Sequence, residues 1–214
     1  GLTLWGGTLT RIEEGTFAGC KTLTELTLPD CITEIEKSAF SSCKSLGSMK
    51  LPDAVKSIPD EAFSGCSSLK KISFAADVNQ IGEKAFYNCV NLQSINLPDG
   101  IKTISKQAFF NCQSLTSVSI PDSVTAIEDG AFAGCRKATK IEIPQKLESI
   151  GDYAFSDCES LRGEQTFTPS GSTEVLIDEC MILPETLQAI GDHAFERCSK
   201  LDGIVFKNGM VMIG

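Results

Sequence analysis

Ten cysteines and one histidine are the residues of this chain best able to do chemistry. Cysteine thiolates bind metals, attack electrophiles and form disulfides, and histidine exchanges protons near neutral pH. Eight of the cysteines form a regular series: Cys20, Cys43, Cys66, Cys89, Cys112, Cys135, Cys158 and Cys198. Successive members are 23 residues apart, except that a 17-residue insertion lengthens the last interval to 40. This spacing decides which of those chemistries is open to them.

The regular spacing argues against metal binding and against disulfides. Structural zinc sites use close pairs such as C-x-x-C, whereas each repeat here contributes a single cysteine. Equivalent side chains of stacked repeats point in parallel directions, and a disulfide needs converging Cβ atoms. We therefore expect the eight to be reduced, buried packing residues. Cys31 and Cys180 lie outside the series, and we expect each to be a free, partly exposed thiol, with an intermolecular disulfide as the alternative.

No catalytic residue is predicted. His193 precedes Ala-Phe at a position that also holds Lys84, Gly130 and Tyr153, so we expect it to face water. No serine or cysteine has a base at a recognisable spacing. Acidic pairs such as Asp60-Glu61 recur just before Ala-Phe, and we interpret them as residues favoured by the dipole at the start of a helical turn. The sequence therefore predicts no enzyme, no metal site and no cofactor.

The cysteines belong to a repeat that covers most of the chain. Each one closes a phrase such as AFSGC (62–66) or AFYNC (85–89), an isoleucine stands five residues before each phenylalanine, and a leucine follows each cysteine by three, except at Ala138. A fixed period of 20–50 residues is typical of a solenoid or an array. One such unit cannot bury its apolar face alone, so neighbouring units must stack.

Within one unit, the residue pattern predicts a short strand followed by a turn. Met49-Lys50-Leu51 alternates with period two, which predicts a strand with Lys50 facing water. Pro52 cannot donate to a strand ladder and ends this strand. Pro59, followed by two acids, is predicted to open a single helical turn.

The pattern C-x-x-L-x-x-I-x-L-P-x-x-V-x-x-I-G-x-x-A-F-x-x-C resembles the 23-residue leucine-rich repeats of the BspA-like (treponemal-type) class over residues 9–206, apart from the insertion. Ala75 replaces the usual proline and Ala138 the usual leucine. The resemblance implies an α/β repeat solenoid, β-rich, with short convex 3₁₀ or α turns and a parallel sheet on the concave face. It further implies a bacterial protein that is secreted or at the cell surface, similar to adhesins that bind host matrix proteins.

We expect one solenoid of about eight coils over residues 1–214. The insertion, 163–179, has β-prone segments on both sides of 169–172 and is predicted to form a hairpin or long loop, with simple drift of a decaying repeat as the alternative. Residues 207–214 place Asn208-Gly209 between alternating apolar residues, which predicts a capping hairpin. The start of a further coil is the alternative there.

Candidate ligand-binding residues are the outward-facing positions of the predicted sheet, which form two adjacent rows. One row is Thr27, Lys50, Ser73, Asn96, Ser119 and Glu142, and the other is Glu25, Ser48, Lys71, Ser94, Ser117 and Lys140. Phe167 of the insertion completes the set. Repeat proteins commonly bind on such a concave face. The rows lack the Trp, Tyr and Arg that dominate binding hot spots, so a plain solvated sheet is the alternative.

Net charge and hydrophobicity limit the kinds of binding partner that this chain can have. A net charge of −9 and a pI of about 4.7 disfavour nucleic acid. No apolar run approaches the ~20 residues that span a bilayer, and any signal peptide would lie outside this sequence. We expect a monomeric, non-enzymatic extracellular or cell-surface module that recognises a host protein, a glycan or another cell through the concave face and the insertion. A structural spacer or stalk is the alternative function.

Overall fold

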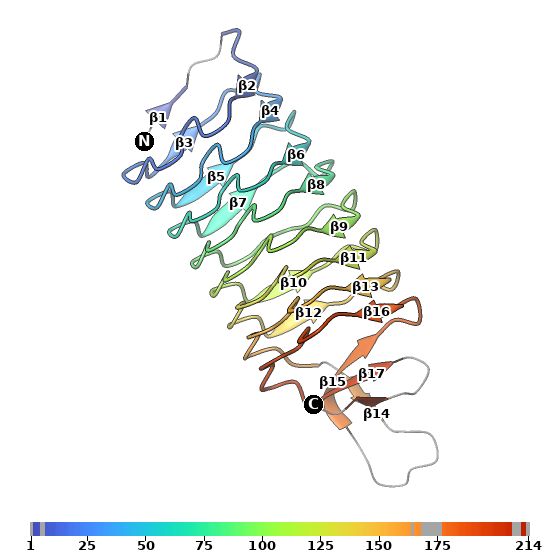
Figure 1. The fold of residues 1–214 in the computed structure, drawn as a ribbon. Helices are drawn as coiled ribbons and strands as arrows, with labels where there is room; N and C mark the ends of the chain where they lie inside the picture. The colour runs from blue at the N-terminus through green and yellow to red at the C-terminus, as the bar shows by residue number, and fades with distance from the viewer. Residues whose placement is uncertain (1, 5–6, 164, 168–176, 207–210, 213–214) are drawn as a thin grey trace.

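The computed structural model describes residues 2–4, 7–163, 165–167, 177–206 and 211–212. The chain winds into a row of stacked coils (Figure 1), a parallel β-solenoid of about eight turns. Each coil is named here for the repeat cysteine that begins it, so that coil 1 begins at Cys20, coil 4 at Cys89 and coil 5 at Cys112.

The first ladder of short parallel strands is the predicted sheet. It pairs β1 (Leu2–Thr3) with β3 (Leu26–Thr27), β5 (Ser48–Lys50) with β7 (Lys71–Ser73), and β10 (Ser117–Ser119) with β12 (Lys140–Glu142). The middle residue of each three-residue strand is buried and the first and third point outward, which is the alternation that the sequence predicts. We call this outward surface the sheet face.

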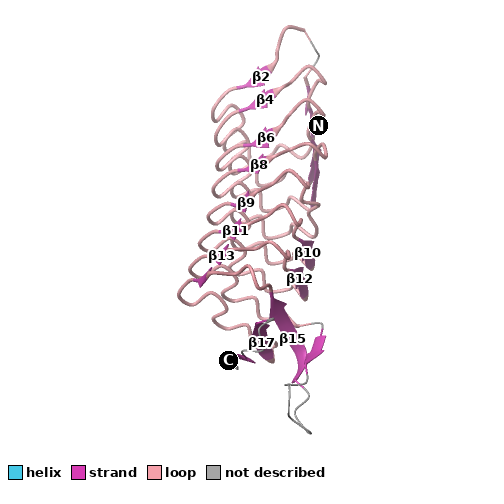
Figure 2. Ribbon diagram, turned by 90° about the vertical axis from the view of Figure 1, so that its right-hand side faces the viewer, coloured by secondary structure: helices cyan, strands magenta, loops and turns pink. Residues whose placement is uncertain are grey.

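A second parallel ladder, which the sequence analysis missed, contains the repeated isoleucines. It pairs β2 (Arg11–Ile12) with β4 (Glu34–Ile35) and β6 (Ser57–Ile58) with β8 (Gln80–Ile81), and it joins β9 (Thr103–Ile104), β11 (Ala126–Ile127), β13 (Ser149–Ile150) and β16 (Ala189–Ile190) in one sheet. Figure 2 shows the two ladders on different sides of the coils.

Proline accounts for one interruption of this second ladder. In the next coil along, the Gly82 amide donates to the Ile58 carbonyl oxygen at 2.8 Å. Pro59 holds the position equivalent to Gly82 and has no N–H to donate, so β4 and β6 are not paired.

The described residues contain no helix, so the predicted α/β class and the 3₁₀ or α turns are wrong. Each turn instead holds two residues with positive φ, such as Glu61 (56°) and Gly65 (72°), and a left-handed residue cannot continue a right-handed helix. Alternate amides of the turn then point along the solenoid. Phe40 N, for example, donates to Ala62 O of the next coil at 2.9 Å, so the turns form a third line of hydrogen bonds between coils.

The acidic residues at the turns have a different role from the predicted one. These turns lie in the described residues and are not helical, so there is no helix dipole for the acidic residues to complement. Asp60 Oδ1 accepts a hydrogen bond from Glu83 N of the next coil at 2.8 Å, and Asp129 Oδ1 accepts one from Asp152 N at 3.1 Å. These carboxylates therefore link one coil to the next. A Cβ on Gly82 would lie 2.5 Å from Asp60 N, so this close approach requires glycine.

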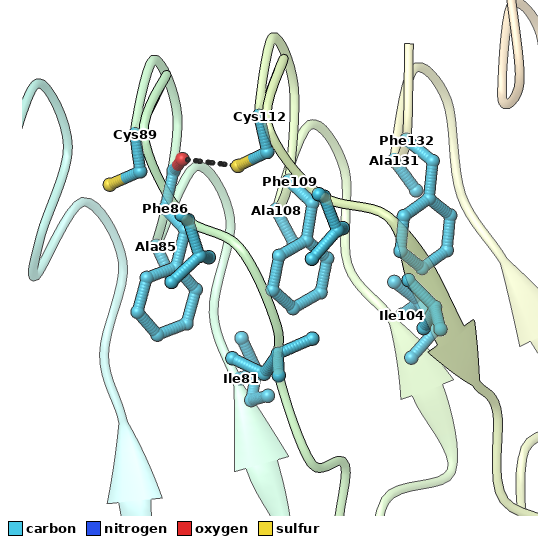
Figure 3. Packing of buried hydrophobic residues seen from close by; sticks show 14 of the residues in the cluster. Ile81, Ala85, Phe86, Cys89, Ile104, Ala108, Phe109, Cys112, Ala131 and Phe132 are labelled. Atoms are coloured by element: carbon cyan, nitrogen blue, oxygen red, sulfur yellow. Dashed lines mark hydrogen bonds between the residues drawn. The ribbon is translucent and has the colours of Figure 1, made fainter. Parts of the chain in front are cut away.

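Columns of identical side chains fill the interior. The repeat phenylalanines from Phe17 to Phe195 stack with ring centroids 5.2–5.7 Å apart. Figure 3 shows Phe86, Phe109 and Phe132 side by side with the neighbouring alanines and isoleucines. Phe86 is fully buried and Ile104 is 1% exposed, as stacking in register requires.

The C-terminal part forms a four-stranded sheet. β14 (Gln165–Phe167) pairs antiparallel with β15 (Ile177–Leu183), β15 pairs parallel with β17 (Gly203–Phe206), and β17 pairs antiparallel with β18 (Val211–Met212). Cys180 of β15 lies opposite Gly203, 23 residues later, so β15 occupies the place of the first-ladder strand in its coil. The predicted loop residues 168–176 and 207–210 lie outside the described residues.

Candidate functional site

The column of repeat cysteines is a structural feature, not a reactive one. The eight cysteines of the series are free thiols, and the series is buried from Cys43 onward, while Cys20 is exposed. Cys112 Sγ, at the start of coil 5, donates a hydrogen bond to Phe86 O, at the end of coil 3, at 3.3 Å (Figure 3). The same carbonyl oxygen accepts the Cys89 amide at 3.1 Å, so both of its lone pairs are used. Each buried thiol of the series makes the same kind of bond and thus links different coils.

Burial also suppresses thiol reactivity. Desolvation raises the pKa of Cys89, Cys135 and Cys198 to about 12, which keeps these thiols protonated at neutral pH. Cys31 is half-buried, as predicted, and its Sγ donates to Leu9 O at 3.1 Å. The prediction for Cys180 is wrong: this residue is only 1% exposed, because β14 pairs alongside it.

The remaining candidates for catalysis are not assembled into a site. His193 is exposed, as predicted, and its ring stacks on Tyr153 with centroids 4.9 Å apart. Its Nδ1 lies 3.6 Å from Glu196 Oε2, with no nucleophile in the arrangement. Within the described part of the chain, no cluster of three or more His, Cys, Asp or Glu residues could hold a metal ion.

The structure places most of the predicted outward rows on the sheet face in facing pairs. Ser48 lies opposite Lys71, Lys50 opposite Ser73, Ser117 opposite Lys140, and Ser119 opposite Glu142. Ser119 Oγ donates to Glu142 Oε2 at 2.6 Å, and Lys140 Nζ lies 3.0 Å from Glu142 Oε1. The hydrogen bond from Ser119 and the charge of Lys140 lower the pKa of Glu142. These pairs form two polar strips along the sheet face.

Three predicted residues lie away from these strips. Glu25 and Thr27 are exposed on coil 1, where Glu25 O accepts the Leu2 amide at 2.9 Å. Phe167 is the last residue of β14, and its side chain is outside the described residues. A role for Phe167 in binding therefore stays a prediction.

Ser94 and Asn96 mark a break in the first ladder. They belong to coil 4, between β7 and β10, where no strand is formed (Figure 1). The last main-chain bond before the break runs from Gln93 N to Lys70 O at 3.1 Å. From Ser94 to Leu97, all of which the structure describes, no main-chain group bonds to another. Their N–H and C=O groups are left to solvent or to a partner.

A cleft of about 290 Å³ lies at this break. It is lined by Ser94, Ile95, Asn96, Leu97, Asp99, Ser117, Ser119 and Pro121. Three hydroxyls, one amide and one carboxylate surround an apolar floor that includes the buried Ile95. Without a nucleophile or a base, this set can recognise a ligand but not transform one.

Sequence reasoning had named four of the eight cleft residues and missed Ile95, Leu97, Asp99 and Pro121. The repeat pattern gives no sign of the cleft, because the cleft lies where strand pairing between coils fails. Sequence reasoning also missed the stacked rings of Tyr87 and Phe110 on the turns, although both depart visibly from the small residues found at that repeat position.

Comparisons with known proteins agree with this architecture. The family described as "BspA type Leucine rich repeat region (6 copies)" matches residues 5–112, 79–175 and 173–214. A T. pallidum leucine-rich repeat protein (TpLRR) is similar, with 30% identity and a TM-score of 0.67 over 79% of this chain and 72% of that one. A leucine-rich repeat protein from Bacteroides ovatus has 28% identity and a TM-score of 0.62 over 92% of this chain.

This chain spans 59% of the Bacteroides ovatus protein. No curated protein matches it. In the described residues, nothing helical has the length and apolar character needed to traverse a bilayer. The family match extends over nearly the whole sequence and coincides with the 23-residue coils seen in the structure. The chain therefore belongs to the BspA-type leucine-rich repeat family.

Proposed function

We propose that this protein is a non-enzymatic, monomeric binding module, extracellular or at the cell surface, that recognises a partner protein through its sheet face. The family suggests a binding or a structural role. The observation that carries the proposal is the break at Ser94–Leu97, where unpaired main-chain groups lie beside a polar cleft. Free donors and acceptors of a β-like segment are what an extended polypeptide uses to dock.

The side chains around the break favour the approach of a polypeptide. Ser94, Ser117 and Ser119 are short, so a partner main chain can come close to the cleft floor. Lys71 on one side and the Lys140–Glu142 pair on the other supply both signs of charge. Charges of both signs at these places fix where along the sheet face a bound polypeptide lies, and they contribute less to its affinity.

A blocking variant tests this site without altering the fold. Ser94→Lys with Ser117→Lys fills the mouth of the cleft, and the fold should accept it because Lys71 and Lys140 hold the same repeat position. The matched control is Ser57→Arg on the second ladder, where β2 carries Arg11 at the equivalent position.

Binding to immobilised fibronectin, laminin and collagen would be measured by surface plasmon resonance. We expect at least one of these to bind, the blocking variant to lose at least about tenfold in affinity, and the control to be unchanged. If none binds, or if the blocking variant binds as well as the wild type, the sheet face is not the recognition surface. Replacing residues 168–176 with a short Gly-Ser linker tests the insertion in the same assay.

A structural spacer is the second candidate function. It is favoured by the phenylalanine column, whose stacked rings run from Phe17 to Phe195 and give the solenoid a continuous core. A spacer should tolerate the blocking variant and the loss of residues 168–176 with no effect on attachment of the cell that displays it.

A further inference from the structure

A second surface, on the turns of adjacent coils, differs from the rest of the repeat. Tyr87 and Phe110 follow the repeat phenylalanine, a position that holds alanine or serine in five of the other coils: Ala18, Ser41, Ser64, Ala133 and Ser156. Their rings are half-buried and stack with centroids 4.9 Å apart and an interplanar angle of 8°. We call Tyr87, Phe110, Asn88, Asn111, Gln107 and Gln113 the turn patch.

The fold does not need these aromatic rings. The main chain of Tyr87 and Phe110 accepts the Gly65 amide at 2.7 Å and the Asn88 amide at 2.8 Å, respectively. Ser64, at the same position one coil earlier, accepts the Ser42 amide in the same way. The turn is therefore built identically with a serine. Two half-exposed aromatic rings at a position that serine can fill are more typical of recognition than of packing.

Side-chain amides form a polarised chain beside the rings. Gln113 Nε2 donates to Asn111 Oδ1 at 2.8 Å, and Asn111 Nδ2 donates to Asn88 Oδ1 at 2.7 Å. Among the described residues, Asn88 Nδ2 at one end and Gln113 Oε1 at the other make no hydrogen bond. This chain of side-chain amides thus offers a hydrogen-bond donor at Asn88 and an acceptor at Gln113.

We infer that the turn patch binds a neutral oligosaccharide. Sugar hydroxyls both donate and accept hydrogen bonds, which suits the two free ends of the amide chain, and sugar C–H faces pack against aromatic rings. All six residues of the patch are uncharged in a chain with a net charge of −9, so an anionic glycan is disfavoured. A stable protein interface takes about 20–30 residues a side, far more than the patch provides.

Repeat-derived substitutions separate binding from folding. Tyr87→Ser with Phe110→Ala installs the residues found at Ser64 and Ala133 in the flanking coils. Asn88→Gly removes the free donor and should not strain the turn, since Gly65 and Gly134 hold the same position with positive φ. Circular dichroism and thermal melting would check that the variants are folded.

Binding would be measured by NMR titration of ¹⁵N-labelled protein with maltohexaose, cellohexaose, mannohexaose and N-acetylglucosamine hexamer, with a heparin hexasaccharide as the anionic probe. We expect a neutral probe to shift the amides of coils 3–5 with millimolar or tighter affinity. Both turn-patch variants should weaken that binding at least tenfold, and Ser94→Lys with Ser117→Lys should leave it unchanged.

The inference is overturned if no neutral probe binds at 10 mM, if only the heparin probe binds, or if the folded variants bind as well as the wild type. It is also overturned if the turn-patch variants lose matrix-protein binding and no sugar competes for it, because the patch would then be a protein contact. The sheet-face proposal has its own variants, so either surface can fail without the other.

Discussion

Raising the pH above 9 should destabilise this solenoid. The repeat cysteines can ionise at that pH in the unfolded chain, but most of those that are buried in the folded chain cannot. Burial raises the pKa of Cys89, Cys135 and Cys198 from the ordinary value of 9.0 to about 12. The contact with the Cys43 thiol, together with burial, raises the pKa of Cys66 and lowers that of Cys43, and burial with the neighbouring thiols raises the pKa of Cys112 and Cys158. A thiol that is harder to ionise in the folded state stabilises the fold fully below pH 9, and this contribution is lost as the pH rises toward 12.

The expected loss follows from linkage. At pH 10, each unfolded thiol with a pKa near 9 favours unfolding by about 1.4 kcal/mol, so the three thiols with a pKa of about 12 contribute roughly 4 kcal/mol. The raised pKa of Cys112 and Cys158 adds to this loss, and the lowered pKa of Cys43 opposes it. The free energy of unfolding should therefore be lower at pH 10 than at pH 8 by several kcal/mol, of which roughly 4 come from Cys89, Cys135 and Cys198.

Urea denaturation followed by circular dichroism, under reducing conditions from pH 7 to 10.5, measures this loss. Cys135→Ala lowers the stability at neutral pH but should reduce the alkaline slope by about 1.4 kcal/mol per pH unit. Cys20→Ser, at an exposed member of the series, is the control and should keep the wild-type slope. A free energy of unfolding that is flat between pH 8.5 and 10.5, or an unaltered slope in Cys135→Ala, would refute the buried protonated column.

Three further substitution and labelling experiments test the coil geometry. Gly82→Ala should lower the free energy of unfolding, measured with urea, by about 1–3 kcal/mol, because the new Cβ would lie 2.5 Å from Asp60 N. Gly47→Ala is the control and should leave it unchanged, because a Cβ there has nothing within 4 Å. Equal losses in the two variants would contradict the close approach at Gly82. Ser42→Gly should raise stability by about 0.5–1 kcal/mol, since Ser42 has a φ of 60°, and a loss would argue against that turn. In native protein, Ellman's reagent should label Cys20 and Cys31 quickly, and the eight buried thiols only on unfolding; rapid labelling of all ten would show the core to be open.

The repeat in the sequence was enough to predict the coils, the inward columns and the first ladder. Period and residue type were sufficient there, because Phe86 and Ile104 recur with the same neighbours in every unit. The turns were mispredicted because Lys84 and Tyr153 adopt positive φ, which neither residue favours. Glycine or asparagine stands before five of the eight repeat cysteines, as at Gly65 and Asn88, and was the available signal of a left-handed turn.

The candidate site was only partly predictable. The outward rows follow from alternation along each strand, so Ser117 and Ser119 could be placed on the sheet face from sequence. The break at coil 4 could not, since Ser94-Ile95-Asn96 reads much like Ser117-Val118-Ser119, which does form a strand. Pairing depends on the relative placement of adjacent coils, which is a property of the stack and not of one repeat.

Native-state hydrogen exchange measured by NMR tests the central claim most directly, namely that coils stack in register through their turns while coil 4 leaves its sheet segment unpaired. We expect the amides of Phe40, Phe63, Phe86, Phe109, Phe132 and Phe155, each bonded to an alanine carbonyl of the next coil, to be among the most protected in the chain. The amides of Ser94, Ile95, Asn96 and Leu97 should exchange quickly. Rapid exchange at the phenylalanines, or protection of Ile95 equal to that of Phe86, would contradict the account.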